Sequence, residues 1–451
     1  MPLGTTHRDT RKAASIPRMR SPLLAATLTA IATLSACASP CTRVKEAYAE
    51  LADATQAGAP GDHLRLSIPL ELANLVVNRE VRQLPRAPVP LPAIAGVSLG
   101  TASVGVDRVL IVPGEADEVS FAADVSVRSG KRSLLPIRID ARVRPRLDPE
   151  SGAVIVALDQ EGLVSMDATL GPGGARALVD ALWAQLPTVA RTMTSKDDLT
   201  RLAEPAATQL LRRAADIVER DMLDELGAIA RIELELPAIA VDEIHVRSTT
   251  DDLIVGVHTP LPAKGAVAPT LPRATPKHQV ELAMHGAVAT ALVNDAMKRG
   301  QVPDRFDLDG AADPNGALKA QLAWDAAGPK PLLVHAFLLD PTKAGRPAKD
   351  CAHITLGATP RVTADRGRLI LATDDAKVQA VEGSTAVKAG LFFGGVSRRS
   401  FEHVEHIAVD TEFELGAQQL RAQLQNAQLT GDTVVFGLTL ASEPPARPAR
   451  R

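Results

Sequence analysis

Residues 145–159 read PRLDPESGAVIVALD, and residues 360–374 read PRVTADRGRLILATD. The second stretch lies 215 residues after the first, and the Pro, Arg, Gly, Ile, Ala and Asp residues coincide. The runs Val154–Leu158 and Leu369–Ala372 inside these stretches are apolar on both faces, which predicts strands in the interior of a sheet. A match of this kind at one offset indicates an internal duplication.

Other matches occur in the same order along the chain. His63 and His278 share the offset of 215, and Val76-Val77-Asn78 aligns with Leu292-Val293-Asn294 at an offset of 216. Both halves close with an Asp-led apolar run, at residues 252–257 and 432–438. Together these matches predict a duplicated unit of about 200 residues.

The segment between the two units has a composition of its own. Residues 259–277 hold five Pro and show neither a helical period nor strand alternation, which is typical of a semi-stiff linker. We therefore place the first unit at 61–258 and the second unit at 278–441. The Pro- and Arg-rich tail at 442–451 is expected to be disordered.

Each unit is expected to begin with an apolar helix and to continue with strands. The apolar helix faces hold Leu72, Leu75, Val76 and Val81 in the first unit, and Val288, Ala291, Leu292 and Met297 in the second. Residues 119–128 and 135–144 alternate apolar and polar side chains, which predicts antiparallel strands with one face exposed. A long helical region with a wide apolar face is predicted at 174–228, followed by strands at 232–236 and 253–257.

These patterns predict an α+β fold of two tandem similar units, each a curled antiparallel sheet wrapped around a long helix. The stretch between Asp374 and Asp432 is 35 residues shorter than its counterpart between Asp159 and Asp252. The second helix of the second unit therefore has no clear place in the sequence.

The N-terminus has the features of a bacterial lipoprotein signal. Basic residues precede an uncharged apolar run, Pro22 to Leu34, which is too short to cross a bilayer. The run ends in Leu34-Ser35-Ala36-Cys37, which resembles the box of small residues before a Cys that is lipidated and becomes the first mature residue. We expect a signal peptide at 1–36, lipid attachment at Cys37 and an anchor spacer at 37–60; the alternative is a plain secretory signal.

The same resemblance carries an expectation about location. Ala38 follows the Cys, as in Gram-negative lipoproteins that are sorted to the outer membrane, so the periplasmic face of that membrane is the expected site. No later segment reaches eighteen apolar residues, and the lipid is expected to be the only membrane attachment.

A helix-wrapped, curled antiparallel sheet that occurs twice resembles the tubular lipid-binding superfamily, which includes the bactericidal/permeability-increasing proteins. The resemblance covers about residues 60–441 and rests on the architecture, the duplication and the lipoprotein signal. It implies an elongated pair of units, each with an apolar groove between helix and sheet that can hold acyl chains. The aliphatic composition fits such a groove and fits an ordinary core equally well.

The composition excludes several classes of protein. Aromatic residues make up 2% of the chain and the formal net charge is −3, so neither stacking platforms nor a basic surface for nucleic acid is expected. Three Cys are too few for a disulfide-dense scaffold or a zinc ribbon.

Several polar clusters lack the spacing that catalysis or metal binding requires. His403-Val404-Glu405-His406 separates its two His by three residues, whereas a zinc-protease helix needs four. Asp251-Asp252 and Asp374-Asp375 fit strand edges, and Gly171-Pro172-Gly173-Gly174 fits a turn because it lacks the Lys-Ser/Thr of a phosphate loop. His63 and His278 occupy equivalent places in the two units, and a structural role before the first helix explains this equivalence without a function. We therefore expect no catalytic residue, no metal site and no cofactor.

Two functional hypotheses share these features. The first is a non-catalytic, membrane-anchored periplasmic lipoprotein that binds or carries an amphipathic lipid in an apolar groove. The second is a structural or scaffolding envelope lipoprotein without a ligand. An envelope hydrolase is a third, weaker alternative.

Cys41 and Cys351 are left after Cys37 is lipidated, in a compartment that favours disulfides. A bond between them would close a very long loop and contribute on the order of 4–5 kcal/mol in the chain-entropy model. It would also require the N-terminal segment to run along the molecule to the second unit. We therefore expect two separate thiols, with Cys351 partly buried and Cys41 free, and keep the disulfide as the alternative.

Overall fold

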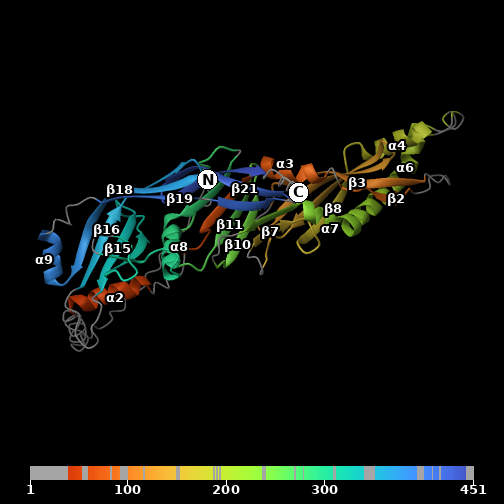
Figure 1. The fold of residues 1–451 in the computed structure, drawn as a ribbon. Coiled ribbons are helices and arrows are strands. Elements are labelled where there is room, and N and C mark those ends of the chain that lie inside the picture. Colours follow the sequence, from red (N-terminus) through yellow and green to blue (C-terminus); the bar gives the residue numbers. More distant parts are fainter. Residues whose placement is uncertain are drawn as a thin grey trace, which may run out of the picture.

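The computed structural model shows an elongated molecule of helices and curled sheets (Figure 1). It describes residues 39–442 except 53–58, 82–83, 92–99, 115–116, 149–152, 186–187, 189–190, 192–194, 236–239, 269–270, 278, 308–310, 340–350, 394–400, 409 and 416–417. Cys37, the expected signal peptide, His278 and residues 443–451 lie outside the described residues. Within the described residues, no helix combines the length and apolar character needed to cross a membrane.

The strands form three sheets, and all strand pairings among the described residues are antiparallel. A five-stranded sheet belongs to the first half. It contains β2 (Ala87–Pro90), β3 (Thr101–Val112), β4 (Val119–Ser129), β5 (Arg132–Val143) and β8 (Leu163–Leu170). A seven-stranded sheet belongs to the second half. It contains β13 (Arg305–Phe306), β14 (Leu318–Trp324), β15 (Leu332–Leu339), β16 (Cys351–Ala358), β18 (Arg368–Gly383), β17 (Pro360–Asp365) and β19 (Phe401–Ala408).

The third sheet has ten strands and takes them from both halves. Its order is β10 (Glu243–Ser248), β11 (Asp252–His258), β1 (Leu64–Pro69), β12 (Val280–His285), β22 (Thr433–Ser442), β21 (Gln418–Thr430), β20 (Asp410–Leu415), β9 (Arg231–Glu235), β7 (Ala153–Ala157) and β6 (Arg146–Leu147). The halves meet where β1 pairs with β12, with Leu64 opposite Met284 and Ser67 opposite Glu281. The two expected units therefore share one sheet.

Helices cover these sheets. They are α2 (Pro40–Ala52), α3 (Leu70–Val81), α4 (Gly174–Gln185), α6 (Lys196–Ile217), α7 (Leu223–Ile229), α8 (Gly286–Lys298) and α9 (Thr385–Phe393), with a π-helical turn η1 (Val218–Met222) between α6 and α7. The long helix α6 begins at a capping box in which the Ser195 hydroxyl accepts from the Asp198 N–H and the Asp198 carboxylate accepts from the Ser195 N–H. Its buried side chains join one large core with the inner faces of the five-stranded sheet.

The structure confirms much of the predicted secondary structure. The alternating stretches are β4 and β5, the region 174–228 holds α4, α6, η1 and most of α7, and all five residues of β7 are buried. The mixed α+β class is confirmed, with mostly antiparallel strands in curled sheets.

Four expectations need correction. Each half begins with a strand, β1 or β12, before its first helix, and β10 is a further strand that the sequence analysis did not predict. Leu75, expected on the apolar face of α3, is 69% exposed. Among the described residues only the first half contains a long helix: α6 has 22 residues, whereas α8 and α9 in the second half have 13 and 9. Residues 259–277, expected as a semi-stiff linker, contain the buried side chains of Thr259, Ala263, Val267 and Thr275.

The order of elements is nevertheless the same in the two halves. β1 and α3 begin 216 residues before β12 and α8, and the hairpin of β6 and β7 has its counterpart in β17 and β18. After the long helices of the first half the offset falls, since β11 begins 181 residues before β22. The shared order agrees with the sequence match, and a common origin of the two halves stays a prediction.

Asn78 and Asn294, which the sequence aligns, make the same contact in each half. The Asn78 amide donates to the Val109 carbonyl at 2.7 Å and accepts from the Val109 N–H at 3.0 Å. Asn294 makes the equivalent pair of bonds to Leu322, at 2.7 and 2.8 Å. Each side chain thus fixes the first helix of its half against a strand, α3 on β3 and α8 on β14.

We predict that Asn78→Ala lowers the free energy of unfolding by about 2 kcal/mol, because it leaves both backbone groups of the buried Val109 without these partners. Asn294→Ala should have a smaller effect because Leu322 is only half-buried. Denaturant unfolding measures both changes, and Asn315→Ala, at an exposed asparagine, is the control. Equal stability of Asn78→Ala and Asn315→Ala would contradict the clamping role.

Candidate functional site

A cavity of about 550 Å³ lies in the second half, between α2, α8, β14 and the segment 261–264. Its volume is in the range of about 300–1,000 Å³ that is typical of small-molecule sites. The helix α8 and the strand β14 form its walls, and both are held from the same turn between β21 and β22.

The first turn of α8 is fixed by two contacts. His285 precedes the helix, and its Nδ1 accepts from the Ala287 N–H at 3.1 Å. The Gly286 N–H donates to the Asp432 carbonyl at 2.7 Å, in the turn between β21 and β22. Near the other end of the helix, Asn294 holds β14. Near the start of α8, Ala287, Thr290 and Ala291 line the cavity, and these small side chains leave space between helix and strand.

The end of the cavity near the start of α8 is mostly apolar, although the exposed Lys264, next to Ala263, also lines it. Ala287 and Ala291 form a small hydrophobic cluster with Ala263 and Val288, against which Leu261, Met284, Leu292 and Trp324 pack. This cluster is separate from the main core. Small alanines and one large indole therefore surround the space at this end.

The end near the last turn of α8 is charged. Lys319 Nζ lies 3.4 Å from the Asp304 carboxylate and 5.2 Å from the centroid of the Tyr48 ring. Its hydrogen bond to Tyr48, followed by the bond to Asp304, raises the pKa of Lys319, so this ammonium stays charged. Lys298 and Asp295 line the same end, and Asp295 pairs with Arg299 at 2.6 Å.

The helix α2 supplies the remaining wall, through Tyr48, Glu50 and Leu51. It packs on β15, β16 and β18 in the second half (Figure 1), although it precedes the first half in sequence. Its inner side chains Val44 and Tyr48 contact Phe337, with the Tyr48 and Phe337 rings 5.2 Å apart and edge to face. The expected spacer thus contains a helix that completes the second half, where the helix after β18 is short.

A disulfide between Cys41 and Cys351 fastens this helix, so the expectation of two separate thiols is wrong. The two Cα atoms are 5.5 Å apart although 310 residues separate the cysteines in sequence. The expectation failed because it placed Cys41 near the first unit, whereas α2 carries Cys41 to the second half. Both cysteines are buried under the contacts of α2 with the second sheet.

Two histidines lie beside this contact in neighbouring strands. His335 Nδ1 and His353 Nε2 are 2.9 Å apart, and the His353 ring stacks on Phe337 with centroids 4.3 Å apart. Burial lowers the pKa of His335 to about 4, and the neighbouring His353 adds to the shift. Burial also lowers the pKa of His353, against the opposing effect of Glu382.

These shifts predict loss of stability in acid. Above pH 6.5, the ordinary pKa of histidine, His335 is neutral in the folded and unfolded states and contributes no pH dependence. Between pH 6.5 and about 4 the unfolded chain takes up a proton that the folded protein does not, which removes up to about 3 kcal/mol. Urea unfolding at several pH values should show a shallower loss in His335→Gln than in wild type. His245→Gln, at a half-buried histidine of β10 in the first half, is the control, and equal profiles for all three proteins would contradict the prediction.

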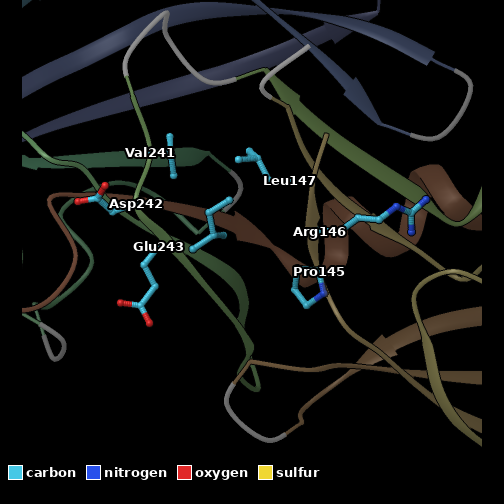
Figure 2. A pocket seen from close by; sticks show the side chains of 7 residues that line it. Pro145, Arg146, Leu147, Val241, Asp242 and Glu243 are labelled. Atoms are coloured by element: carbon cyan, nitrogen blue, oxygen red, sulfur yellow. The ribbon is translucent and has the colours of Figure 1, made fainter. Parts of the chain in front are cut away.

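A smaller cavity of about 290 Å³ lies at a seam of the ten-stranded sheet. Pro145, Arg146 and Leu147 line one side and residues 241–244 line the other, so the two edge strands β6 and β10 face each other across it. Figure 2 shows Leu147 and Val241 directed toward the gap. Arg146 is bound to Asp159 at 2.6 Å, so its charge is already matched.

The polar clusters of the sequence are spread over separate elements. His403 and His406 lie on β19, Asp251 and Asp252 lie at the start of β11, and Asp375 pairs with Lys330 at 2.8 Å. Gly171 to Gly173 form the turn before α4, as predicted, with Gly173 at a φ of 72°. His63 is buried, with Nδ1 2.9 Å from the Thr259 hydroxyl, and has a structural role in this contact. No group of three or more potential metal ligands occurs among the described residues.

The residues that line the larger cavity were not predicted from the sequence. One available signal was the spacing of Val44, Ala47, Tyr48 and Leu51, which places four apolar residues on one face of a helix. Another was Trp324, since the chain has two Trp in all. Lys319 carried no local signal.

Comparisons with known proteins identify no family. No family model and no curated protein match the chain. A crystal structure of lipopolysaccharide binding protein is similar at 14% identity and a TM-score of 0.22, covering 85% of this chain and 100% of that one. P47 of Clostridium botulinum E1 is similar at 7% identity and a TM-score of 0.44, covering 84% of this chain and 99% of that one. P47 of Clostridium botulinum A2 is similar at 7% identity and a TM-score of 0.33, covering 85% and 82%. None of the three assigns a function to the chain.

Proposed function

We propose that this protein binds an amphipathic lipid, without catalysing a reaction, in the cavity between α2, α8 and β14. The observation that carries the proposal is the change of polarity along the cavity. Ala287, Ala291 and Trp324 surround one end, and Lys319, Asp304 and Lys298 surround the other. A ligand with an apolar tail and a polar headgroup matches this gradient, because burying either part at the wrong end would cost free energy.

The architecture supports the same proposal. The repeated order of strands and helices, with the aligned Asn78 and Asn294 contacts, fits a duplicated unit of the tubular lipid-binding kind. In this interpretation the groove between helix and sheet is open in the second half, where α8 presents alanines to β14. In the first half the corresponding helix α3 packs on β3 within the main core.

Native mass spectrometry of the mature chain, released from its anchor in gentle conditions, tests lipid binding. Co-purifying lipid supports a carrier, and a clean apo mass favours the alternative of a structural envelope lipoprotein without a ligand. Ala291→Phe should weaken binding of an added lysophospholipid by about tenfold or more, because the ring fills the space that the chain needs.

Ala289→Phe is the matched control. Ala289 lies on the same helix, is half-buried, and does not line the cavity. Unchanged lysophospholipid binding in Ala291→Phe would mean that the lipid does not bind in this cavity. Loss of binding in both variants, with the fold intact by circular dichroism, would also argue against this cavity.

We further propose that Cys37 is lipidated and attaches the protein to the periplasmic face of the outer membrane. The support is the Leu34-Ser35-Ala36-Cys37 box after an uncharged apolar run. Cys37→Ser should yield a soluble or unprocessed protein. A fully processed mutant that remains in the membrane fraction would contradict this proposal.

A further inference from the structure

Trp324 lies at the mostly apolar end of the proposed lipid cavity, and a distant turn fixes its position. It is the last residue of β14, and its indole Nε1 donates to the Asp432 Oδ1 at 3.0 Å. Asp432 lies in the turn between β21 and β22. The carbonyl of the same Asp432 accepts from the Gly286 N–H. One residue thus positions both the indole and the first residue of α8.

The indole lies directly on the backbone of that residue. A Cβ at position 286 would overlap atoms of the fused Trp324 ring system, so the close approach requires glycine. The ring is therefore held between the start of α8 and the β21–β22 turn. It can yield little to a ligand, because moving it would break the bond to Asp432.

The position of the ring decides how far an acyl chain can enter. From the charged end, a chain would pass Leu322 and Ala291 before it reached Ala287 and the indole. Because the far end is mostly apolar and the indole is anchored, the chain terminus would meet the indole and stop. The Gly286 backbone and Asp432 lie against the ring and hold it in place.

We infer that Trp324 sets the maximum acyl-chain length of the bound lipid and that Asp432 is its positioning residue. This inference rests on the proposed lipid binding. It predicts a specific dependence on chain length. Affinity for the cavity should rise about fourfold for each added methylene until the chain reaches the indole, and then stop rising or fall.

The test uses lysophospholipids of increasing saturated chain length, bound to wild type and to Trp324→Ala. In wild type the rise should end at a definite length; in Trp324→Ala it should continue past that length. Asp432→Ala keeps the Trp324 ring but removes its hydrogen bond to Asp432. In this variant the affinity should level off more gradually with chain length. Trp183→Ala is the matched control, because Trp183 lies on α4 in the first half, and it should leave the limit unchanged.

A second measurement leaves Trp324 in place. In Trp183→Phe the remaining indole is Trp324. A bound lysophospholipid that carries bromine near the end of its acyl chain should quench the fluorescence of this indole far more than one that carries bromine near the headgroup. Binding with the same length limit in wild type and Trp324→Ala, or equal quenching from both bromine positions, would overturn the inference while lipid binding stands. If no lysophospholipid binds wild type, both the inference and the proposed function fail.

Discussion

Replacing Cys41 and Cys351 together by alanine is expected to lower the free energy of unfolding by about 4 kcal/mol. The bond closes a loop across 310 residues, and in the chain-entropy model a loop of that length restricts the unfolded chain strongly. Alanine is preferable to serine because both positions are buried, and a serine hydroxyl there would have no contact with water. Denaturant unfolding of wild type, with and without a reducing agent, gives the same comparison without mutation.

A second consequence concerns the cavity. Without the bond, α2 is held by Val44, Tyr48 and the other contacts of its small cluster, which is separate from the main core. We therefore expect α2 to separate from the second sheet at lower denaturant than the rest of the protein unfolds. Hydrogen exchange of residues 40–52 in the double variant measures this separation. Equal stability and equal protection of α2 in the two proteins would contradict the role assigned to the disulfide.

Replacing Glu281 by leucine is expected to destabilise the protein by about 3–5 kcal/mol, because it removes one charge of a buried pair. Glu281 on β12 is 1% exposed and Arg65 on β1 is 3% exposed, with 4.0 Å between Nη2 and Oε1. Glu281 Oε2 also accepts from the Ala274 N–H at 2.9 Å and from the Thr275 N–H and hydroxyl at 3.1 Å. Arg65 donates to the Ala268 carbonyl at 2.7 Å. The pair therefore holds Ala268, Ala274 and Thr275 against the junction of the two halves.

A double-mutant cycle distinguishes the pair from its surroundings. Arg65→Met with Glu281→Leu should be less destabilised than Glu281→Leu alone, because no guanidinium then remains buried without this carboxylate. Glu281→Gln keeps the volume and some acceptor capacity and should fall between wild type and Glu281→Leu. Strictly additive effects of the two single changes would mean that Arg65 and Glu281 do not interact.

Local sequence patterns determined the elements whose burial follows a simple period. The alternation at 119–128 and 135–144 specified β4 and β5, because one face of each strand packs in the core and the other meets water. The wide apolar face of residues 211–226 specified the end of α6, the π-helical turn η1 and the start of α7. The aligned stretches 145–159 and 360–374 each became a hairpin, β6 with β7 and β17 with β18. The same patterns failed at Leu75, since a single apolar residue at helical spacing does not show which neighbour is present to cover it.

Tertiary structure alone decided which distant segments meet. The ten-stranded sheet joins β1 to β12 and β9 to β20, and no local period encodes the choice of partner strand. The cavity exists because α2, α8 and β14 converge, although α2 and α8 are separated by the whole first half. The disulfide between Cys41 and Cys351 illustrates why segments far apart in sequence can meet. Loop-closure entropy grows only slowly with loop length, so closing 310 residues costs little more than closing a loop half as long. Val44 and Tyr48 offset part of that cost by burying apolar surface against Phe337.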